Sequence, residues 1–314
     1  MKLSAIKWII VFAVLFVLWL MNNRYEVFAL NLFGASDQYK GSFRVMTYNI
    51  NAPLDDESET IKTILINEIN KQKPDILCLQ ESSTIFNTLQ STLDSLFNYT
   101  DSMAIKNQPY RYCLYSKKPI RNFKIYKCIT KIDSIVIDSL RKEVNKLYNR
   151  MPVYSAEIEI LPDKWINVFA CHLRSSAYST ARRSMNKDAS WYDGLPLYIE
   201  NYKIGQKIRN WEADNLRVHL DSLDSMDTPV IIAGDFNDWS GSYCMNTIRD
   251  GKYKDAWWEA GFGLGITYDE WQLKLRLDHI LYSHHFKLVN VCVEKSKFSD
   301  HRPLIADFTL KDPH

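Results

Sequence analysis

Six places in the sequence put a carboxylate, amide or imidazole side chain at the edge of an apolar run. The carboxylates of Glu and Asp and the amide oxygen of Asn form a hard-oxygen set that suits Mg²⁺ or another hard divalent cation. Histidines at such positions can accept and donate protons. Together these side chains could hold a metal ion and move a proton beside it. They are Asn49, Glu81, His172, Asp235 with Asn237, Asp278 with His279, and Asp300 with His301.

Each position taken alone also has a purely structural explanation. Asn49 and Glu81 could cap turns, and His172 could be a hydrogen-bonded core residue. The Gly-Asp-Phe-Asn-Asp stretch at 234–238 also consists of residues that favour turns. Turn chemistry does not account for all six places in one chain, so we predict that they form one shared site.

Short β-rich runs dominate the chain from residue 43 to its end, and the polar positions lie where these runs begin or end. Proteins of mixed α/β structure tend to build their sites at such strand ends. The predicted strands cover residues 43–50, 75–80, 111–116, 122–129, 153–161, 165–173, 229–236, 277–283, 286–294 and 303–310.

Two helical patterns interrupt the strands. Apolar residues from Ile61 to Ile69 recur at helical spacing, and Pro74 ends that pattern. A second pattern runs from Ile204 to Leu223. Many strands with few helices predict two β-sheets packed face to face with helices outside, in a single α/β domain over residues 43–314.

Six motifs carry the polar positions: TYNIN (47–51), LQES (79–82), HLRS (172–175), GDFND (234–238), LDHILYS (277–283) and SDHRPLIADF (299–308). In this order and at these distances they resemble the endonuclease/exonuclease/phosphatase superfamily over about residues 43–310. The resemblance implies a four-layer α/β sandwich and a phosphoester hydrolase that depends on Mg²⁺, with Mn²⁺ as a substitute. Phosphoester hydrolysis builds negative charge on the non-bridging oxygens, which a divalent cation and histidine donors stabilise.

The resemblance also implies a role for each side chain. Glu81 would be the principal metal ligand, assisted by Asn49 and Asp300.

His301 would be the general base that activates water, and Asp278 would orient it and stabilise its charge. A carboxylate beside a histidine raises the basicity of the imidazole and fixes its tautomer. Asp235 and Asn237 would hold the attacking water or a phosphate oxygen. His172 would donate a hydrogen bond to the phosphate.

The sequence departs from the family pattern at two places. No carboxylate occurs in residues 108–118, where the deoxyribonuclease branch carries a glutamate behind its equivalent histidine, so the sequence names no partner for His172. Asn51 stands where some members carry a metal-associated aspartate. That substitution is compatible with one metal ion or with two.

Residues 174–194 come immediately after His172 and Leu173, and beyond Ser175 they match no shared motif. Basic and aromatic side chains are interleaved there, which suits a phosphate-bearing substrate with a stacking or lipid-like group. A solvated surface loop explains the same composition equally well. The candidate substrate contacts are Arg174, Tyr178, Arg182 and Arg183.

An uninterrupted apolar run at residues 8–21 follows Lys2 and Lys7. Its length suits a membrane anchor or the core of a signal peptide. Aromatic residues near both ends and a poor cleavage site favour an uncleaved anchor over a cleaved signal or a buried core helix. We therefore expect an anchor or signal at 1–29, a linker at 30–42, and a catalytic domain exported to the periplasm or the extracellular space.

The charge balance bears on the substrate. Without residues 1–29, which carry Lys2, Lys7, Arg24 and Glu26, the basic residues fall from 39 to 36 and the acidic ones from 37 to 36. A protein that holds nucleic acid by charge alone would be clearly basic. A phosphodiesterase that binds its phosphoester substrate transiently is still compatible with this balance.

Three hypotheses about function follow. The first is a nuclease-like phosphodiesterase. The second is a phosphodiesterase or phosphatase that acts on phospholipids or inositol phosphates, which the membrane-proximal placement and the near-neutral charge favour. The third is an inactive binding module on the same fold, against which the complete set of site residues argues. The sequence indicates no protein partner.

Overall fold

The computed structural model describes the chain in segments that include both halves of the expected site. These segments are residues 11–19, 22, 29–30, 41–51, 59–82, 92–93, 95–100, 113–126, 153–176, 195–270 and 273–311.

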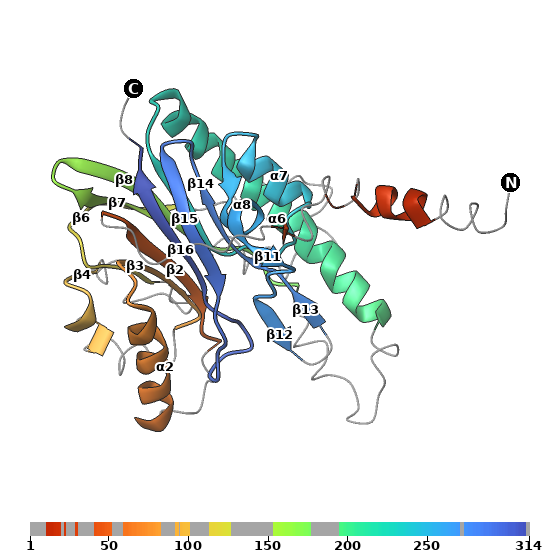
Figure 1. Cartoon of the computed structure of the whole chain (residues 1–314), viewed down its shortest axis with the longest axis horizontal. Coiled ribbons are helices and arrows are strands. Elements are labelled where there is room, and N and C mark those ends of the chain that lie inside the picture. The colour runs from red at the N-terminus through yellow and green to blue at the C-terminus, as the bar shows by residue number, and fades with distance from the viewer. Residues whose placement is uncertain are drawn as a thin grey trace, which may run out of the picture.

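Two six-stranded sheets face each other at the centre of the molecule (Figure 1). The first contains β2 (Phe43–Asn49), β3 (Ile76–Gln80), β4 (Tyr99–Thr100), β5 (Cys113–Ser116), β15 (Phe286–Val293) and β16 (Leu304–Leu310), in the order β15-β16-β2-β3-β5-β4. The second contains β6 (Ile120–Tyr126), β7 (Val153–Leu161), β8 (Lys164–His172), β9 (Val230–Asp235), β10 (Lys254–Asp255) and β14 (Asp278–Tyr282), in the order β10-β14-β9-β8-β7-β6.

Each predicted strand is present, with small differences at the ends. The strand predicted at 122–129 begins two residues earlier, at Ile120, and residues 127–129 lie outside the described part of the chain. Two two-stranded sheets were not predicted, because their strands are too short to show a period. They pair β1 (Ala29–Leu30) with β11 (Phe262–Gly263) and β12 (Tyr268–Glu270) with β13 (Leu273–Leu275).

Alternating residues on the first sheet separate two cores. Val45 and Ile76 point to the second sheet and join the core between the sheets. Met46 and Leu77, one position further along, point outward and pack with Leu65 of α2 (Glu59–Gln72). This helix therefore covers the outer face of the first sheet (Figure 1), and successive strand residues serve opposite faces.

The second sheet follows the same rule. Ile231 of β9 points into the core between the sheets, whereas Ile232 points outward and packs with Leu216 of α6 (Leu195–Ser225). The short helix α7 (Tyr243–Arg249) lies on the same outer face and contributes Met245. Helix, sheet, sheet and helix form four layers, so the predicted α/β sandwich is confirmed.

The helices differ from the prediction in length and number. The helix α2 begins at Glu59 and ends at Gln72, close to the predicted stop at Pro74. The long helix α6 begins at Leu195, nine residues before Ile204, and ends two residues after Leu223. The short helices α7 and α8 (Ala256–Ala260) were not predicted.

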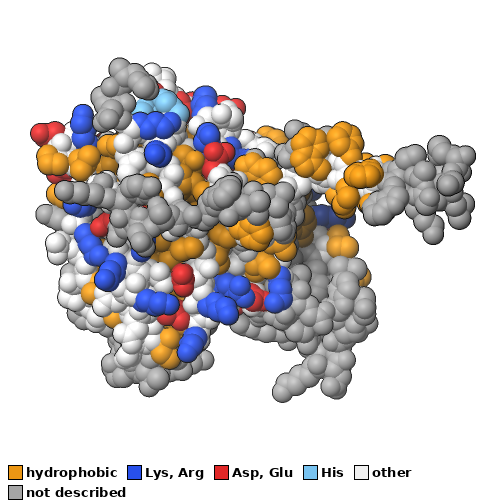
Figure 2. All heavy atoms as spheres, in the orientation of Figure 1, with side chains coloured by type: hydrophobic (Ala, Val, Ile, Leu, Met, Phe, Trp, Pro, Cys, Tyr) orange, Lys and Arg blue, Asp and Glu red, His pale blue; other side chains and the backbone are white. Residues whose placement is uncertain are grey.

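Residues 11–19 form a short helix that stands away from the sheets (Figure 1). Its apolar side chains are exposed and form an orange cluster in Figure 2, with Phe12 66% and Trp19 52% accessible. Within the described segments, no helix combines the length and the apolar character needed to cross a membrane. Residues 1–10 and 20–21 of the predicted anchor lie outside those segments.

The boundary predicted between residues 29 and 30 falls inside a strand. Ala29 is 1% exposed and pairs with Gly263, and Leu30 pairs with Phe262. The expected linker at 30–42 therefore starts with a residue that belongs to the domain.

Candidate active site

The ends of the central strands bring the polar side chains together. β2 and β3 are parallel and pair Asn49 with Gln80, so Glu81 follows directly beside Asn49. β8 and β9 are also parallel and pair His172 with Asp235. β14 runs antiparallel to β9 and places Asp278 opposite Asp235. Parallel strands end at the same edge of a sheet, and this edge carries the site.

A carboxylate–histidine pair joins the two sheets. His301 Nδ1 lies 2.8 Å from Asp278 Oδ2, with Asp278 fully buried and His301 5% exposed. The other ring nitrogen, Nε2, lies 3.8 Å from Asp235 Oδ2. The ring of Tyr268 packs on the imidazole at 5.0 Å between centroids. The structure thus brings together the predicted general base and its predicted orienting carboxylate.

The charges within this cluster shift the pKa values of His301 and Asp235. Burial alone would lower the pKa of His301, but the charges of Asp278 and Asp235 outweigh it and raise this pKa to about 10. Burial raises the pKa of Asp235 to about 7, against the opposing effect of the His301 charge. The two carboxylates therefore favour the protonated form of the imidazole.

Asn237 fixes the side chain of Asp235. Its backbone is left-handed, with φ 53°, a conformation that asparagine tolerates. Its N–H donates to Asp235 Oδ1 at 2.8 Å, and its Nδ2 donates to Asp235 Oδ2 and to the Leu173 carbonyl, both at 3.1 Å. Asn237 therefore orients Asp235 and keeps its own amide oxygen for another partner.

The residues expected to bind metal line one pocket. Glu81, Asn49 and Asp300 surround it together with Asp235 and His301. Glu81 has a left-handed backbone, with φ 55°, and its Oε1 accepts a hydrogen bond from Asn49 Nδ2 at 3.1 Å. The same Asn49 nitrogen donates to Asp235 Oδ2 at 2.9 Å and links the two sheets.

Asn51 and Ser299 hold the other side of this pocket. Asn51 Nδ2 donates to Asp300 Oδ1 at 2.9 Å, and the Asn51 N–H donates to Asn49 Oδ1, also at 2.9 Å. Ser299 Oγ donates to the Asn49 carbonyl at 2.8 Å. Asn49 Oδ1 keeps one lone pair, and Asp300 keeps its second oxygen, for a cation. The oxygen donors fit a hard divalent ion.

His172 faces two carboxylates. Its Nε2 lies 3.3 Å from Glu81 Oε1 and 3.7 Å from Asp235 Oδ2. The sequence named no partner for this histidine, and the structure places its ring beside the expected metal ligand. His172 is the last residue of β8 and pairs with Asp235, the last residue of the parallel strand β9, so its ring lies at the edge of the sheet that carries the site.

The expected substrate contacts are described only in part. Arg174 is half-buried, its N–H donates to Glu212 Oε2 at 2.8 Å, and its carbonyl accepts from Arg209. Tyr178, Arg182 and Arg183 lie outside the described residues.

His279, which we grouped with Asp278 in the predicted shared site, belongs instead to a buried network that was not predicted. His279 is fully buried, with Nδ1 2.9 Å from Asp255 Oδ2 and Nε2 3.0 Å from the Asp238 carbonyl. Arg276 Nη1 also donates to Asp255 Oδ2 at 2.8 Å, and Arg276 Nη2 donates to Ser240 Oγ. Burial would raise the pKa of Asp255, but Arg276 and His279 hold it well below its usual range. Through Asp238 and Ser240, the network fixes the loop that follows Asn237.

Thr267 is a second contributor that sequence reasoning missed. Its Oγ1 accepts hydrogen bonds from the N–H groups of Leu277 and Asp278, both at 3.0 Å. The next residue, Tyr268, packs on the imidazole of His301. Neither residue belongs to a motif or an apolar period, so no sequence signal marks them.

The comparisons with known proteins agree with this fold. Similar solved structures include the catalytic domain of human Nocturnin with a bound sulfate anion, at 19% identity, over 90% of this chain and 96% of that one, with a TM-score of 0.59. D. rerio TDP2 complexed with a single-strand DNA product is 16% identical over 86% of this chain and 100% of that one, with a TM-score of 0.58. ANGEL2, a 2′,3′-cyclic phosphatase in complex with adenosine-2′,3′-vanadate, is 15% identical over 88% and 97%, with a TM-score of 0.59.

At these identities the likeness concerns the fold. No curated protein matches the sequence. The model of the Endonuclease/Exonuclease/phosphatase family matches residues 46–301, which include all six motifs up to His301. The chain therefore belongs to the endonuclease/exonuclease/phosphatase family of phosphoester hydrolases.

Proposed function

We propose that the protein is a divalent-metal-dependent phosphodiesterase that acts on a nucleic-acid or nucleotide phosphoester. The observation that carries this proposal is the Asp278–His301 pair, whose free ring nitrogen opens toward Asp235 and the pocket of Glu81 and Asp300. A proton acceptor and a set of cation ligands beside one open pocket are what metal-assisted hydrolysis requires.

The side chains of the chain divide the work of the reaction. Once it has released its own proton, His301 Nε2 accepts the proton of the attacking water, and Asp278 stabilises the imidazolium that forms and keeps Nδ1 protonated. Asp235, held by Asn237, orients that water. His172 donates to a phosphate oxygen and stabilises the charge that develops there.

Glu81, Asp300 and Asn49 would hold the cation. When bound, the ion neutralises charge on the phosphate. Mg²⁺ prefers such oxygen donors and an octahedral shell completed by water, and Mn²⁺ accepts the same donors.

The substrate class rests on the similar structures and on the surface. One of them holds a single-strand DNA product and another an adenosine-2′,3′-vanadate, which supports a nucleotide-type phosphoester. The exposed apolar side chains of residues 11–19 keep a lipid phosphoester as the second candidate.

We further propose that this segment anchors the protein to a membrane and that the domain is exported. Fractionation of cells that produce the full-length or the truncated protein tests this proposal.

A substrate panel tests the proposed activity. Purified protein is assayed with Mg²⁺ and with Mn²⁺ on single-stranded DNA, RNA, cyclic nucleotides, sphingomyelin and inositol phosphates. We expect hydrolysis of a nucleic-acid or nucleotide substrate that EDTA abolishes and added metal restores. His301→Ala should abolish it without changing the circular dichroism spectrum, whereas His219→Ala, an exposed histidine on α6, should not. Activity that survives EDTA contradicts the proposal.

A further inference from the structure

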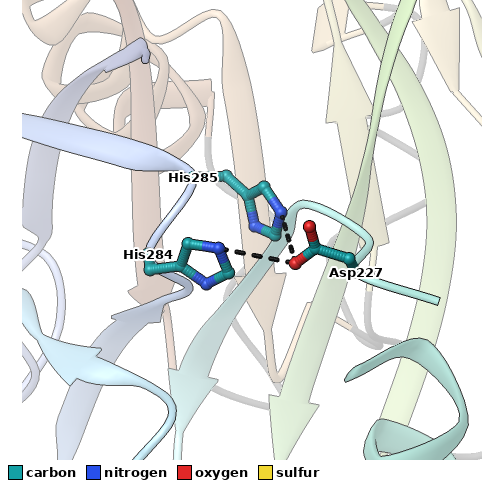
Figure 3. A group of neighbouring side chains, drawn as sticks. All are labelled: Asp227, His284 and His285. Carbon is teal, nitrogen blue, oxygen red and sulfur yellow. Dashed lines mark ion pairs between the residues drawn. The ribbon is translucent and has the colours of Figure 1, made fainter. Parts of the chain in front are cut away.

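Two histidines and an aspartate meet at the opposite end of the second sheet from the catalytic pocket. His284 and His285 follow β14, and Asp227 precedes β9. His285 Nε2 lies 3.1 Å and His284 Nε2 lies 3.4 Å from Asp227 Oδ1. Figure 3 shows both rings directed at the same carboxylate oxygen. The group lies beyond the start of β9, about 17 Å or more from Asp235 along the strand, at about 3.3 Å per residue.

The backbone fixes this arrangement before any ligand binds. The Ser283 N–H donates to the Val230 carbonyl at 3.0 Å, and the Val230 N–H donates to Ser283 Oγ at 3.1 Å. The Thr228 N–H donates to the Leu223 carbonyl at 3.1 Å, which closes the turn that carries Asp227. The loop before β9 and the turn after β14 are therefore held side by side by the ends of the sheet.

We propose that Asp227, His284 and His285 form a second cation site, selective for a borderline divalent transition ion such as Zn²⁺. One oxygen and two nitrogen atoms, one from each residue, all lie within 4.8 Å of one another. In a tetrahedral zinc site with bonds of about 2.0–2.1 Å, neighbouring ligand atoms are about 3.3 Å apart. The two nitrogen–oxygen distances, 3.1 and 3.4 Å, match that spacing.

Ser283 prepares His285 for this role. Its Oγ lies 3.0 Å from His285 Nδ1. A hydroxyl oxygen can accept a hydrogen bond from Nδ1–H, and in that tautomer Nε2 carries no proton and can bind a metal. Ring nitrogens that bind metal are commonly held in this way through the other nitrogen.

The ligand types separate this site from the catalytic pocket. Imidazole suits zinc, copper and nickel, whereas the carboxylate and amide oxygens of the catalytic pocket suit Mg²⁺. The side chains of Asp227 and His284 are 77% and 71% exposed, and that of His285 is 19% exposed. Water can therefore complete the coordination shell, and the ion would join two segments of the surface rather than take part in the reaction.

Zinc titration of the full-length protein in saturating Mg²⁺ tests the proposal. We expect a zinc site whose affinity falls by about tenfold or more in His285→Ala and in Asp227→Asn, since each variant removes one of three ligands. The matched control His219→Ala removes an exposed histidine elsewhere and should leave the affinity within about twofold. Equal zinc affinity in wild type and His285→Ala would overturn the proposal.

A second measurement reports the geometry. Co²⁺ in place of zinc should give the strong visible absorption of a tetrahedral site in wild type and lose it in His284→Ala. Zinc should also raise the melting temperature of wild type, but not that of Asp227→Asn, because it binds only the folded site. A cobalt spectrum unchanged in His284→Ala contradicts the proposal. Hydrolysis in Mg²⁺ should be the same in all these variants, so failure of the zinc site leaves the proposed activity untouched.

Discussion

At the scale of single residues, the proposed chemistry depends on the Asp278–His301 pair. Asp278→Asn keeps the shape of the side chain but can no longer stabilise an imidazolium at 2.8 Å. We expect kcat to fall about 100- to 10,000-fold with little change in KM, as in other carboxylate–histidine pairs. Steady-state kinetics measure this, with circular dichroism as the check on folding. A loss confined to KM would mean that Asp278 binds substrate instead.

A second residue-scale prediction concerns stability in acid. Asp255 is buried against Arg276 and His279, and its pKa in the folded protein lies below the value of about 4 in an unfolded chain. The unfolded state therefore takes up the proton first as the pH falls. The stabilisation is fully present above about pH 5 and is lost progressively below about pH 4.

Asp255→Asn should remove most of this acid dependence and cost about 3 kcal/mol at pH 7, because Arg276 then lacks its charged partner. Urea unfolding at pH 3 to 7 measures both effects. Asp163→Asn is the matched control: it lies on the exposed β7–β8 turn with φ 60°, which asparagine also tolerates. Parallel pH curves for wild type and Asp255→Asn would contradict the assignment.

At the scale of elements, Gly234 allows β8 and β9 to pair beside the site. A Cβ on Gly234 would lie 2.0 Å from the Cys171 carbonyl oxygen, so Gly234→Ala must push the two strands apart. We expect the free energy of unfolding to fall by about 3 kcal/mol. Activity should also fall in protein that is still folded, since His172 and Asp235 end these strands. Gly251→Ala is the control: its φ is +66° but nothing lies within 4 Å, so about 1 kcal/mol is expected.

The long elements could be predicted from the sequence, and the short ones could not. The strand 229–236 has an apolar run bounded by Pro229 and polar residues, and the structure contains it as β9. The helix α8 has five residues and begins at a buried Asp255 cap, which local composition does not distinguish from a turn.

For the site, the motifs identified the residues that the strand ends bring together, including Glu81, Asp235 and His301. They did not identify Thr267, Arg276 or Asp255, because these act through contacts between segments far apart in the chain. Long-range hydrogen bonds of this kind leave no periodic signal. The role of His172 beside Glu81 also required the pairing of β8 with β9.

At the scale of the whole molecule, the domain should fold without the N-terminal helix. The apolar side chains of residues 11–19 are exposed, whereas Ala29 is buried and pairs with β11. Removal of residues 1–28 should therefore leave the melting temperature nearly unchanged. Removal of residues 1–30 should lower it by a few degrees, because the β1–β11 pairing is lost. Differential scanning calorimetry of the two truncated proteins distinguishes these outcomes.

The hydrogen bond from Asn49 to Asp235 has a wider consequence, because it connects side chains from different sheets. The Asp278–His301 pair also joins the two sheets. The proposed activity should therefore depend on how the two sheets are aligned. A small shift of one sheet relative to the other would separate the proposed base and metal ligands from Asp235 and Asp278, while the backbone hydrogen bonds within each sheet stayed intact. As the urea concentration rises, hydrolysis should therefore cease before the far-ultraviolet circular dichroism changes. Loss of activity would then report the loss of packing between the sheets before any loss of secondary structure.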